Sequence, residues 1–148
     1  MRIALSADHA GYDLKDVLVQ WLRETGHEVL DLGTNGPASV DYPDFGARLA
    51  RALASGEAER GIEICGSGIG IAIAANRNPT CRCAQVNEPL SATLARTHND
   101  ANAIALGARL IGVDMAKACV TAFLSTEFEG GRHQRRVDML SHLTEVHD

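Results

Sequence analysis

The sequence predicts a single-domain α/β protein: a three-layer α/β/α sandwich around a five-stranded parallel sheet of the Rossmann-like type. Short apolar runs alternate with segments of helical periodicity along the whole chain. The connections between them are short, which is typical of a parallel sheet covered by helices on both faces. Neither a repeat nor a linker interrupts the pattern, so residues 1–148 are expected to form one domain.

The strands are expected at the short apolar runs, namely 2–7, 27–32, 61–65, 81–86 and 103–106. The first helix, 11–25, carries its apolar residues on one stripe, leaves Lys15 off that stripe and ends before Gly26. Further helices are expected at 43–55, 69–77, 88–98 and 113–125. Pro89 suits the first turn of its helix. A C-terminal helix is expected from about residue 132, after two glycines.

Composition argues against several classes of partner. The net charge of −5 gives no general attraction to nucleic acid or an anionic membrane. No apolar stretch approaches the roughly 18 residues of a membrane helix, and the N-terminus does not resemble a secretory signal. Cys81, Cys83 and Cys119 fit buried free thiols of a reducing compartment, so a cytoplasmic protein is expected. No spacing of cysteine and histidine matches a zinc site, and no metal is expected.

Ligands of open parallel sheets bind beyond the carboxyl ends of the strands. This rule indicates three places: Asp8-His9, the turn Cys65-Gly66-Ser67-Gly68-Ile69-Gly70, and Asn87-Glu88. The first of these places has a structural alternative. Asp8 or Asp13 can cap the first helix. His98, which lies elsewhere at the end of its helix, is on its own better explained as a cap favoured by the helix dipole.

The glycines of the turn 65–70 allow backbone N–H groups to converge on an anion, either a phosphate or an oxyanion formed during reaction. A dinucleotide fingerprint fits poorly, because its third glycine would fall at Ile71 and the turn follows the third strand rather than the first. A phosphate-binding loop would need Gly-Lys-Ser or Gly-Lys-Thr, which is absent. A purely structural turn stays open as an alternative.

Cys65 ends the third strand, where the following helix could lower the pKa of its thiol and make it a base or nucleophile. A small buried hydrophobe is the alternative. Arg132 and Arg136 lie four residues apart on one helix face and repel each other, which an anion between them would explain. A solvated face with acidic surface partners, Asp138 and Glu127, explains them equally well.

Taken in order, these residues resemble one family closely: ribose-5-phosphate isomerase type B, with its galactose-6-phosphate isomerase relatives. The resemblance runs from residue 8 to residue 136. Its most specific blocks are Thr97-His98-Asn99-Asp100-Ala101-Asn102 and Glu129-Gly130-Gly131-Arg132-His133-Gln134-Arg135-Arg136. Ser67 stands where many relatives have threonine, and no acid follows in Gly70-Ile71-Ala72-Ile73, so the chain resembles the cysteine-base type.

The resemblance implies a metal-free, cofactor-free aldose–ketose isomerase that interconverts D-ribose 5-phosphate and D-ribulose 5-phosphate in the pentose phosphate pathway. Cys65 matches the base that moves a proton between C2 and C1 through a cis-enediolate, His98 the acid of ring opening, and Ser67 a supporting hydroxyl. The remaining positions match substrate contacts. Gly66, Gly68, Ile69 and Gly70 would bind the enediolate oxygens, Asp8, His9 and Asn99 the sugar, and Arg109, Arg132 and Arg136 with His9 the phosphate.

The resemblance also implies a homodimer with each active site built from both chains, a tetramer being the larger alternative. Other phosphosugars stay open as substrates: allose 6-phosphate, galactose 6-phosphate or a tetrose 4-phosphate. A non-catalytic sugar-phosphate-binding protein is a further alternative. The presence of Cys65, Ser67 and His98 together argues against it, because a pure binder needs no base.

Overall fold

The computed structural model describes residues 1–143 and contains one five-stranded sheet in which all paired strands are parallel. The strand order is β2–β1–β3–β5–β4. The strands are β1 (Arg2–Ala7), β2 (Glu28–Asp31), β3 (Arg60–Cys65), β4 (Cys83–Gln85) and β5 (Ala103–Gly107). The helices are α1 (Tyr12–Glu24), α2 (Tyr42–Ala54), α3 (Ile69–Ala75), α4 (Pro89–Asn99), α5 (Val113–Ser125) and α6 (Arg132–Leu140).

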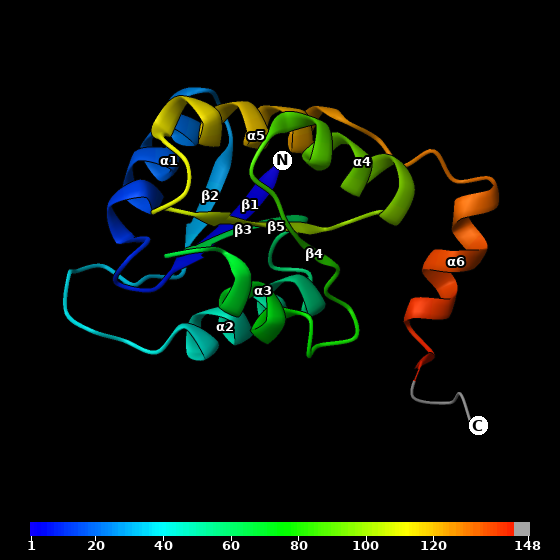
Figure 1. Ribbon diagram of the computed structural model, residues 1–148, viewed down its shortest axis with the longest axis horizontal. Helices are drawn as coiled ribbons and strands as arrows, with labels where there is room; N and C mark the ends of the chain where they lie inside the picture. Colours follow the sequence, from blue (N-terminus) through cyan, green and yellow to red (C-terminus); the bar gives the residue numbers. More distant parts are fainter. Residues whose placement is uncertain (144–148) are drawn as a thin grey trace.

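The sheet is the middle of three layers (Figure 1). Helices α1, α4 and α5 cover one face, and α2 and α3 cover the other. Along β3 the side chains alternate between these layers, because successive residues of a strand point to opposite faces. Ile62 and Ile64 join the core under α1, whereas Cys65 joins the cluster under α3. The predicted fold class is therefore confirmed, and element bounds differ by only a few residues.

Helix α6 lies apart from the three layers, at the end of the molecule where α4 ends (Figure 1). The pairing between Glu129 N–H and the Thr97 carbonyl, 3.2 Å long, ties the segment before α6 to the last turn of α4. The predicted C-terminal helix is thus present at residues 132–140. Residues 144–148, which the sequence placed in the same domain, lie outside the described residues.

Two polar residues near the sheet have structural roles. Lys15, expected off the apolar stripe of α1, is completely buried. Its Nζ lies 2.9 Å from both oxygens of Asp31 and 3.3 Å from Asn35 Oδ1, so the buried charge is paired.

Glu88, one of the candidate ligand-binding residues, caps α4 by accepting the N–H groups of Leu90 and Ser91. These bonds, with one from the Ser91 hydroxyl, hold the pKa of the Glu88 carboxyl below its ordinary value.

No helix within residues 1–143 is both long enough and apolar enough to cross a membrane.

Candidate active site

The turn after β3 holds Cys65 in a fixed position at the carboxyl edge of the sheet. Cys65 is 4% exposed, and the N–H of Gly68 donates to its Sγ at 3.1 Å. Gly68 has φ +77° and lies against the backbone of Leu106, so a side chain there would meet both strain and a clash. Ser67 Oγ accepts the N–H of Ile69 at 3.2 Å. The sequence therefore forms a tight strand-to-helix turn with the thiol on its inner side.

Further side chains surround this turn. An ideal Cβ on Gly66 would lie 3.1 Å from Arg109 Nη1, which places the guanidinium directly over the turn. An ideal Cβ on Gly70 would lie 2.8 Å from the ring of Tyr42, so a larger residue there would displace that ring. Gln85 Nε2 donates to the carbonyl of Ser67 at 3.0 Å. Sequence reasoning did not assign Gln85, because its relation to the turn arises only from tertiary packing.

Asp8 and His9 follow β1, the neighbour of β3 in the sheet, so they lie on the same edge as Cys65. Asp8 Oδ1 accepts the N–H groups of Ala10 and Gly11 at 3.0 and 3.2 Å, so it holds the turn before α1, whereas the helix itself has no side-chain cap at Gly11. His9 Nδ1 accepts the N–H of Val40 at 3.2 Å. The other ring nitrogen, Nε2, therefore carries the proton in the neutral ring and is the donor available to a ligand.

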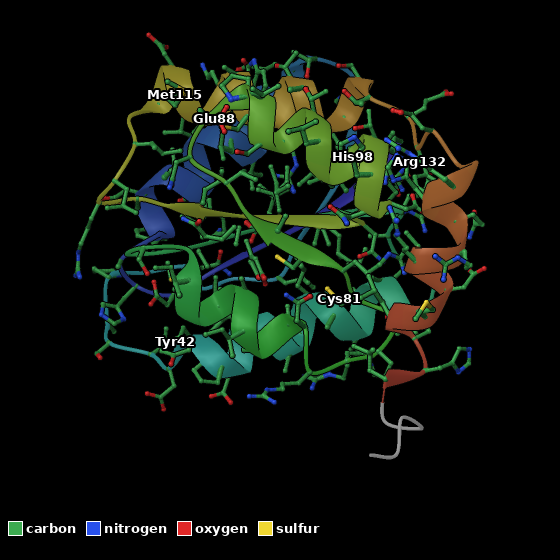
Figure 2. All side chains as sticks on the ribbon, turned by 45° about the vertical axis from the view of Figure 1, so that its right-hand side comes forward. Tyr42, Cys81, Glu88, His98, Met115 and Arg132 are labelled. Atoms are coloured by element: carbon green, nitrogen blue, oxygen red, sulfur yellow. The ribbon has the colours of Figure 1, made fainter. Side chains whose placement is uncertain are left out.

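His98 and Asn99 lie at the opposite edge of the sheet. They form the last turn of α4, which returns from the carboxyl end of β4 to the amino end of β5. Arg132 begins α6 beside them, and both His98 and Arg132 appear at the α6 end of the molecule, far from Tyr42 (Figure 2). The ring of His98 stacks on that of His133, with centroids 4.5 Å apart and planes 19° from parallel.

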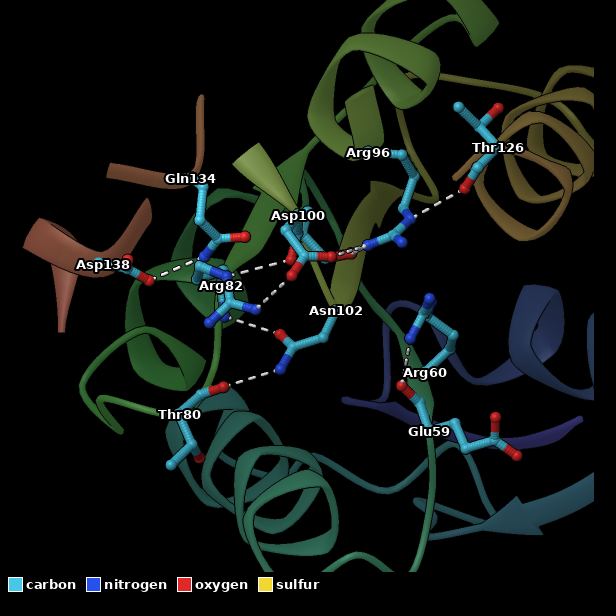
Figure 3. A network of polar contacts seen from close by, with 11 residues as sticks. Glu59, Arg60, Thr80, Arg82, Arg96, Asp100, Asn102, Thr126, Gln134 and Asp138 are labelled. Carbon is cyan, nitrogen blue, oxygen red and sulfur yellow. Dashed lines mark hydrogen bonds and ion pairs between the residues drawn. The ribbon is translucent and has the colours of Figure 1, made fainter. Parts of the chain in front are cut away.

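The last turn of α4 is held by a network of buried and half-buried polar groups (Figure 3). Asp100 takes the left-handed conformation that ends the helix, with φ 46°, and accepts Arg96 Nη1 at 2.9 Å and Arg82 Nη2 at 3.4 Å. Asn102 accepts the N–H of Arg82 and donates to the carbonyl of Thr80, both at 2.7 Å. Asp100 and Asn102 thereby fix the loop that follows His98 and Asn99.

Arg132 and Arg136 of α6 are exposed and carry no carboxylate partner within residues 1–143. Asp138, considered as a surface partner, accepts Gln134 Nε2 instead. Burial lowers the pKa of His133, and the neighbouring His98 and Arg132 lower it further. The guanidinium groups of Arg132 and Arg136 thus present positive charge that no carboxylate within residues 1–143 pairs, an arrangement suited to an anionic ligand.

Glu63 lies in β3 two residues before Cys65, so its side chain points to the same face of the sheet as Cys65. Glu63 is fully buried, and the Cys83 thiol donates to its Oε1 at 3.1 Å. Burial raises the pKa of Glu63 well above its ordinary value and also raises the pKa of Cys83. Burial raises the pKa of Cys81 to about 12. These thiols are free and their protonated forms are favoured, so they act as part of the core.

The structure thus divides the predicted site residues into two groups. The carboxyl-edge group comprises Asp8, His9, Cys65, Gly66, Ser67, Gly68, Ile69, Gly70 and Arg109. The amino-edge group comprises His98, Asn99, Arg132 and Arg136. Strand β5 separates the two edges over five residues, which is roughly 16 Å at about 3.3 Å per residue. One chain alone does not bring Cys65 and His98 together.

Comparison with known proteins identifies the family. A model described as Ribose/Galactose Isomerase matches residues 3–140. Ribose-5-phosphate isomerase B of Escherichia coli is 46% identical over 140 residues, covering 95% of this chain and 94% of its own. The Clostridium thermocellum ribose-5-phosphate isomerase B structure superposes with a TM-score of 0.96 at 48% identity, covering 98% of both chains. The Mycoplasma genitalium ribose-5-phosphate isomerase B structure, with bound ribulose-5-phosphate, has a TM-score of 0.91 at 36% identity and covers 99% of this chain and 97% of its own. The chain belongs to the ribose/galactose isomerase family.

Proposed function

We propose that this protein is an aldose–ketose isomerase that interconverts D-ribose 5-phosphate and D-ribulose 5-phosphate. The observation that carries the proposal is the turn after β3, where the buried Cys65 lies among backbone N–H groups at the carboxyl edge of the sheet. Relatives named ribose-5-phosphate isomerase B, and a related structure with bound ribulose-5-phosphate, support this choice of substrate.

In this mechanism Cys65 removes the C2 proton of the open-chain aldose and returns it at C1. The negative charge that develops on the enediolate oxygens is stabilised by N–H groups of the turn 66–70 and by the Ser67 hydroxyl. The N–H groups of Gly68 and Ile69 act through the groups they already hold, Cys65 Sγ and Ser67 Oγ. Donors positioned in advance are effective because they need no reorganisation as charge develops, and loss of one typically costs about 3–4 kcal/mol of barrier. His98 protonates the ring oxygen when the furanose opens.

Residues of both the carboxyl-edge group and the amino-edge group contact the substrate in this proposal. Asp8 keeps its second carboxylate oxygen, Oδ2, for a sugar hydroxyl, since Oδ1 is used by the backbone. Asn99 binds a hydroxyl from the opposite group. The phosphate is bound by Arg109, Arg132 and Arg136, with His9 donating from Nε2.

We infer that each active site takes the carboxyl-edge group from one copy and the amino-edge group from another, in a homodimer. The separation of roughly 16 Å within one chain supports this, because it exceeds the length of a pentose phosphate. Exposed apolar side chains on and beside α4 and α5, namely Leu90, Leu94, Leu110, Val113 and Met115, provide surface that a second copy can cover. The whole chain would then act as one catalytic domain in the cytoplasm.

The activity can be tested with purified protein and ribose 5-phosphate in the presence of a chelator. Ribulose 5-phosphate should form without added metal. Cys65→Ala should abolish turnover while ligand binding persists, and Cys83→Ala should remain active as the matched control, because the Cys83 thiol donates to Glu63 and not to a group of the turn. Full activity of Cys65→Ala would contradict the role proposed for Cys65. Turnover of only a hexose or tetrose phosphate would keep the mechanism and change the substrate.

A further inference from the structure

Three potential metal ligands meet at the end of α4. A ring nitrogen of His98, a ring nitrogen of His133 and a carboxylate oxygen of Glu129 all lie within 4.8 Å of one another. His98 lies in the last turn of α4, Glu129 lies in the segment before α6, and His133 lies in the first turn of α6. Sequence spacing gave no sign of this group, because its members are brought together only by the docking of α6.

The backbone holds these residues in place. Glu129 N–H donates to Thr97 O at 3.2 Å, and His133 N–H donates to Gly130 O at 3.0 Å. The side chains of all three residues make no hydrogen bond to another residue within 1–143, so their ligand atoms are uncommitted. His133 is also 9% exposed, which is unusual for a ring without a hydrogen-bond partner.

We propose that His98, Glu129 and His133 form a binding site for a transition-metal ion of the zinc type, and that a metal bound there inhibits the enzyme. Two imidazoles and one carboxylate are a common protein ligand set for zinc with a fourth position left open. Metal–ligand bonds of about 2.0–2.1 Å require the three ligand atoms to approach more closely than they do now. Glu129 is exposed and precedes two glycines, so its side chain can move toward the ion. The stacked ring of His98 must also turn against that of His133, so that the lone pairs of both rings meet at the ion.

Local charge determines which cations can bind. Arg132 and Arg136 face the same region, and within residues 1–143 Glu129 is the one acidic group acting on His133 there. The field is therefore not attractive to a cation in general, and binding must come from imidazole coordination. Zinc, nickel and cobalt favour imidazole, whereas magnesium and calcium favour oxygen ligands and keep their water. Selectivity for the transition metals follows.

Inhibition rests on the proposed function, because it assumes that His98 takes part in ring opening. A metal bound to His98 occupies the nitrogen lone pair that would carry the proton. Inhibition should therefore lower kcat for ribose 5-phosphate, and a chelator should reverse it.

The test measures Zn²⁺ and Mg²⁺ binding by calorimetry, and Co²⁺ binding by its visible absorption, on the whole protein. One Zn²⁺ per chain is expected, with no Mg²⁺ binding at the same concentration. Glu129→Gln should weaken Zn²⁺ by more than the roughly 10–100-fold that loss of an outer-sphere partner costs. Glu127→Gln, two residues away in the same segment, should bind Zn²⁺ like the unmodified protein. Isomerase activity without metal should be unchanged in both variants, and Glu129→Gln should resist inhibition by Zn²⁺.

The outcomes separate the two claims. No Zn²⁺ binding, or equal binding by the unmodified protein and Glu129→Gln, overturns the site. Binding at this site with undiminished turnover overturns the inhibitory role and counts against the part assigned to His98. A protein that binds Zn²⁺ as expected but converts no ribose 5-phosphate even with chelator supports the metal site and contradicts the proposed function.

Discussion

The two edges of the sheet differ in how firmly they hold their functional groups. At the carboxyl edge, Cys65 and Gly68 are buried in the body of the protein, and the turn is braced by Gln85. At the amino edge, Arg132 and Arg136 project from a helix that lies outside the three layers. The difference indicates that the proposed base, Cys65, is preorganised in the core, whereas Arg132 and Arg136, two of the groups proposed to bind phosphate, lie on the periphery, where they can reach another copy.

The arginines of α6 give the largest expected effect. Arg132→Ala should raise the KM for ribose 5-phosphate by about 10–100-fold, since a charged hydrogen bond contributes about 1.5–3 kcal/mol. The kcat should change little, because the role proposed for Arg132 is in binding and not in proton transfer. Arg135→Ala is the matched control: its guanidinium contacts Met139 on the same helix, and its loss should leave KM unchanged. A fall in kcat with KM unchanged in Arg132→Ala would contradict the phosphate assignment. Steady-state kinetics measure both constants.

The loop after His98 gives an intermediate effect, on stability. Asp100→Asn keeps a residue that tolerates the left-handed conformation but removes the charge paired with the buried Arg96. The free energy of unfolding should fall by about 1–3 kcal/mol, the range for leaving a buried polar group poorly paired. Urea unfolding measures this change. Asp138→Asn, which removes an exposed carboxylate bound only to Gln134, should be nearly neutral. Equal decreases in the free energy of unfolding in the two variants would show that the hydrogen bonds and ion pairs of Asp100 do not stabilise the fold more than a surface carboxylate does.

The smallest effect concerns Glu63, the buried acid of β3. The pKa of Glu63 is raised in the folded state, so above the ordinary value of 4.5 the unfolded chain loses this proton while the folded chain keeps it. The Glu63 contribution to stability therefore declines as pH rises from about 4.5 towards the folded pKa. Glu63→Gln should flatten that decline in urea unfolding measured across pH. Glu127→Gln removes the same charge from the surface, and a similar flattening there would refute the assignment to Glu63.

Much of the fold could be predicted because alternating apolar periodicity and short connections determine a parallel sheet almost by themselves. The rule that ligands bind beyond the carboxyl ends of strands also located Asp8, His9 and Cys65 on one edge. The element ends were less certain where no strong stop signal stands, as at β4, which is shorter than the apolar run around it.

Contacts between distant segments could not be predicted in the same way. Lys15 was expected on a polar face, but Asp31 and Asn35 pair its charge, and periodicity carries no information about such partners. Helical spacing showed that Arg132 and Arg136 share a face, yet gave no indication that His133 stacks on His98. The separation of His98 from Cys65 likewise depends on the direction of α4 across the sheet.

Mixing two inactive variants tests the shared active site most directly. Cys65→Ala and His98→Gln are each purified, combined in equal amounts under conditions that exchange subunits, and assayed for conversion of ribose 5-phosphate. If each site takes Cys65 from one copy and His98 from the other, a mixed dimer keeps one intact site. Random exchange then restores about a quarter of the unmodified activity, as two-fold symmetry requires. No recovery after demonstrated exchange would show that both residues act within one chain and would contradict the account.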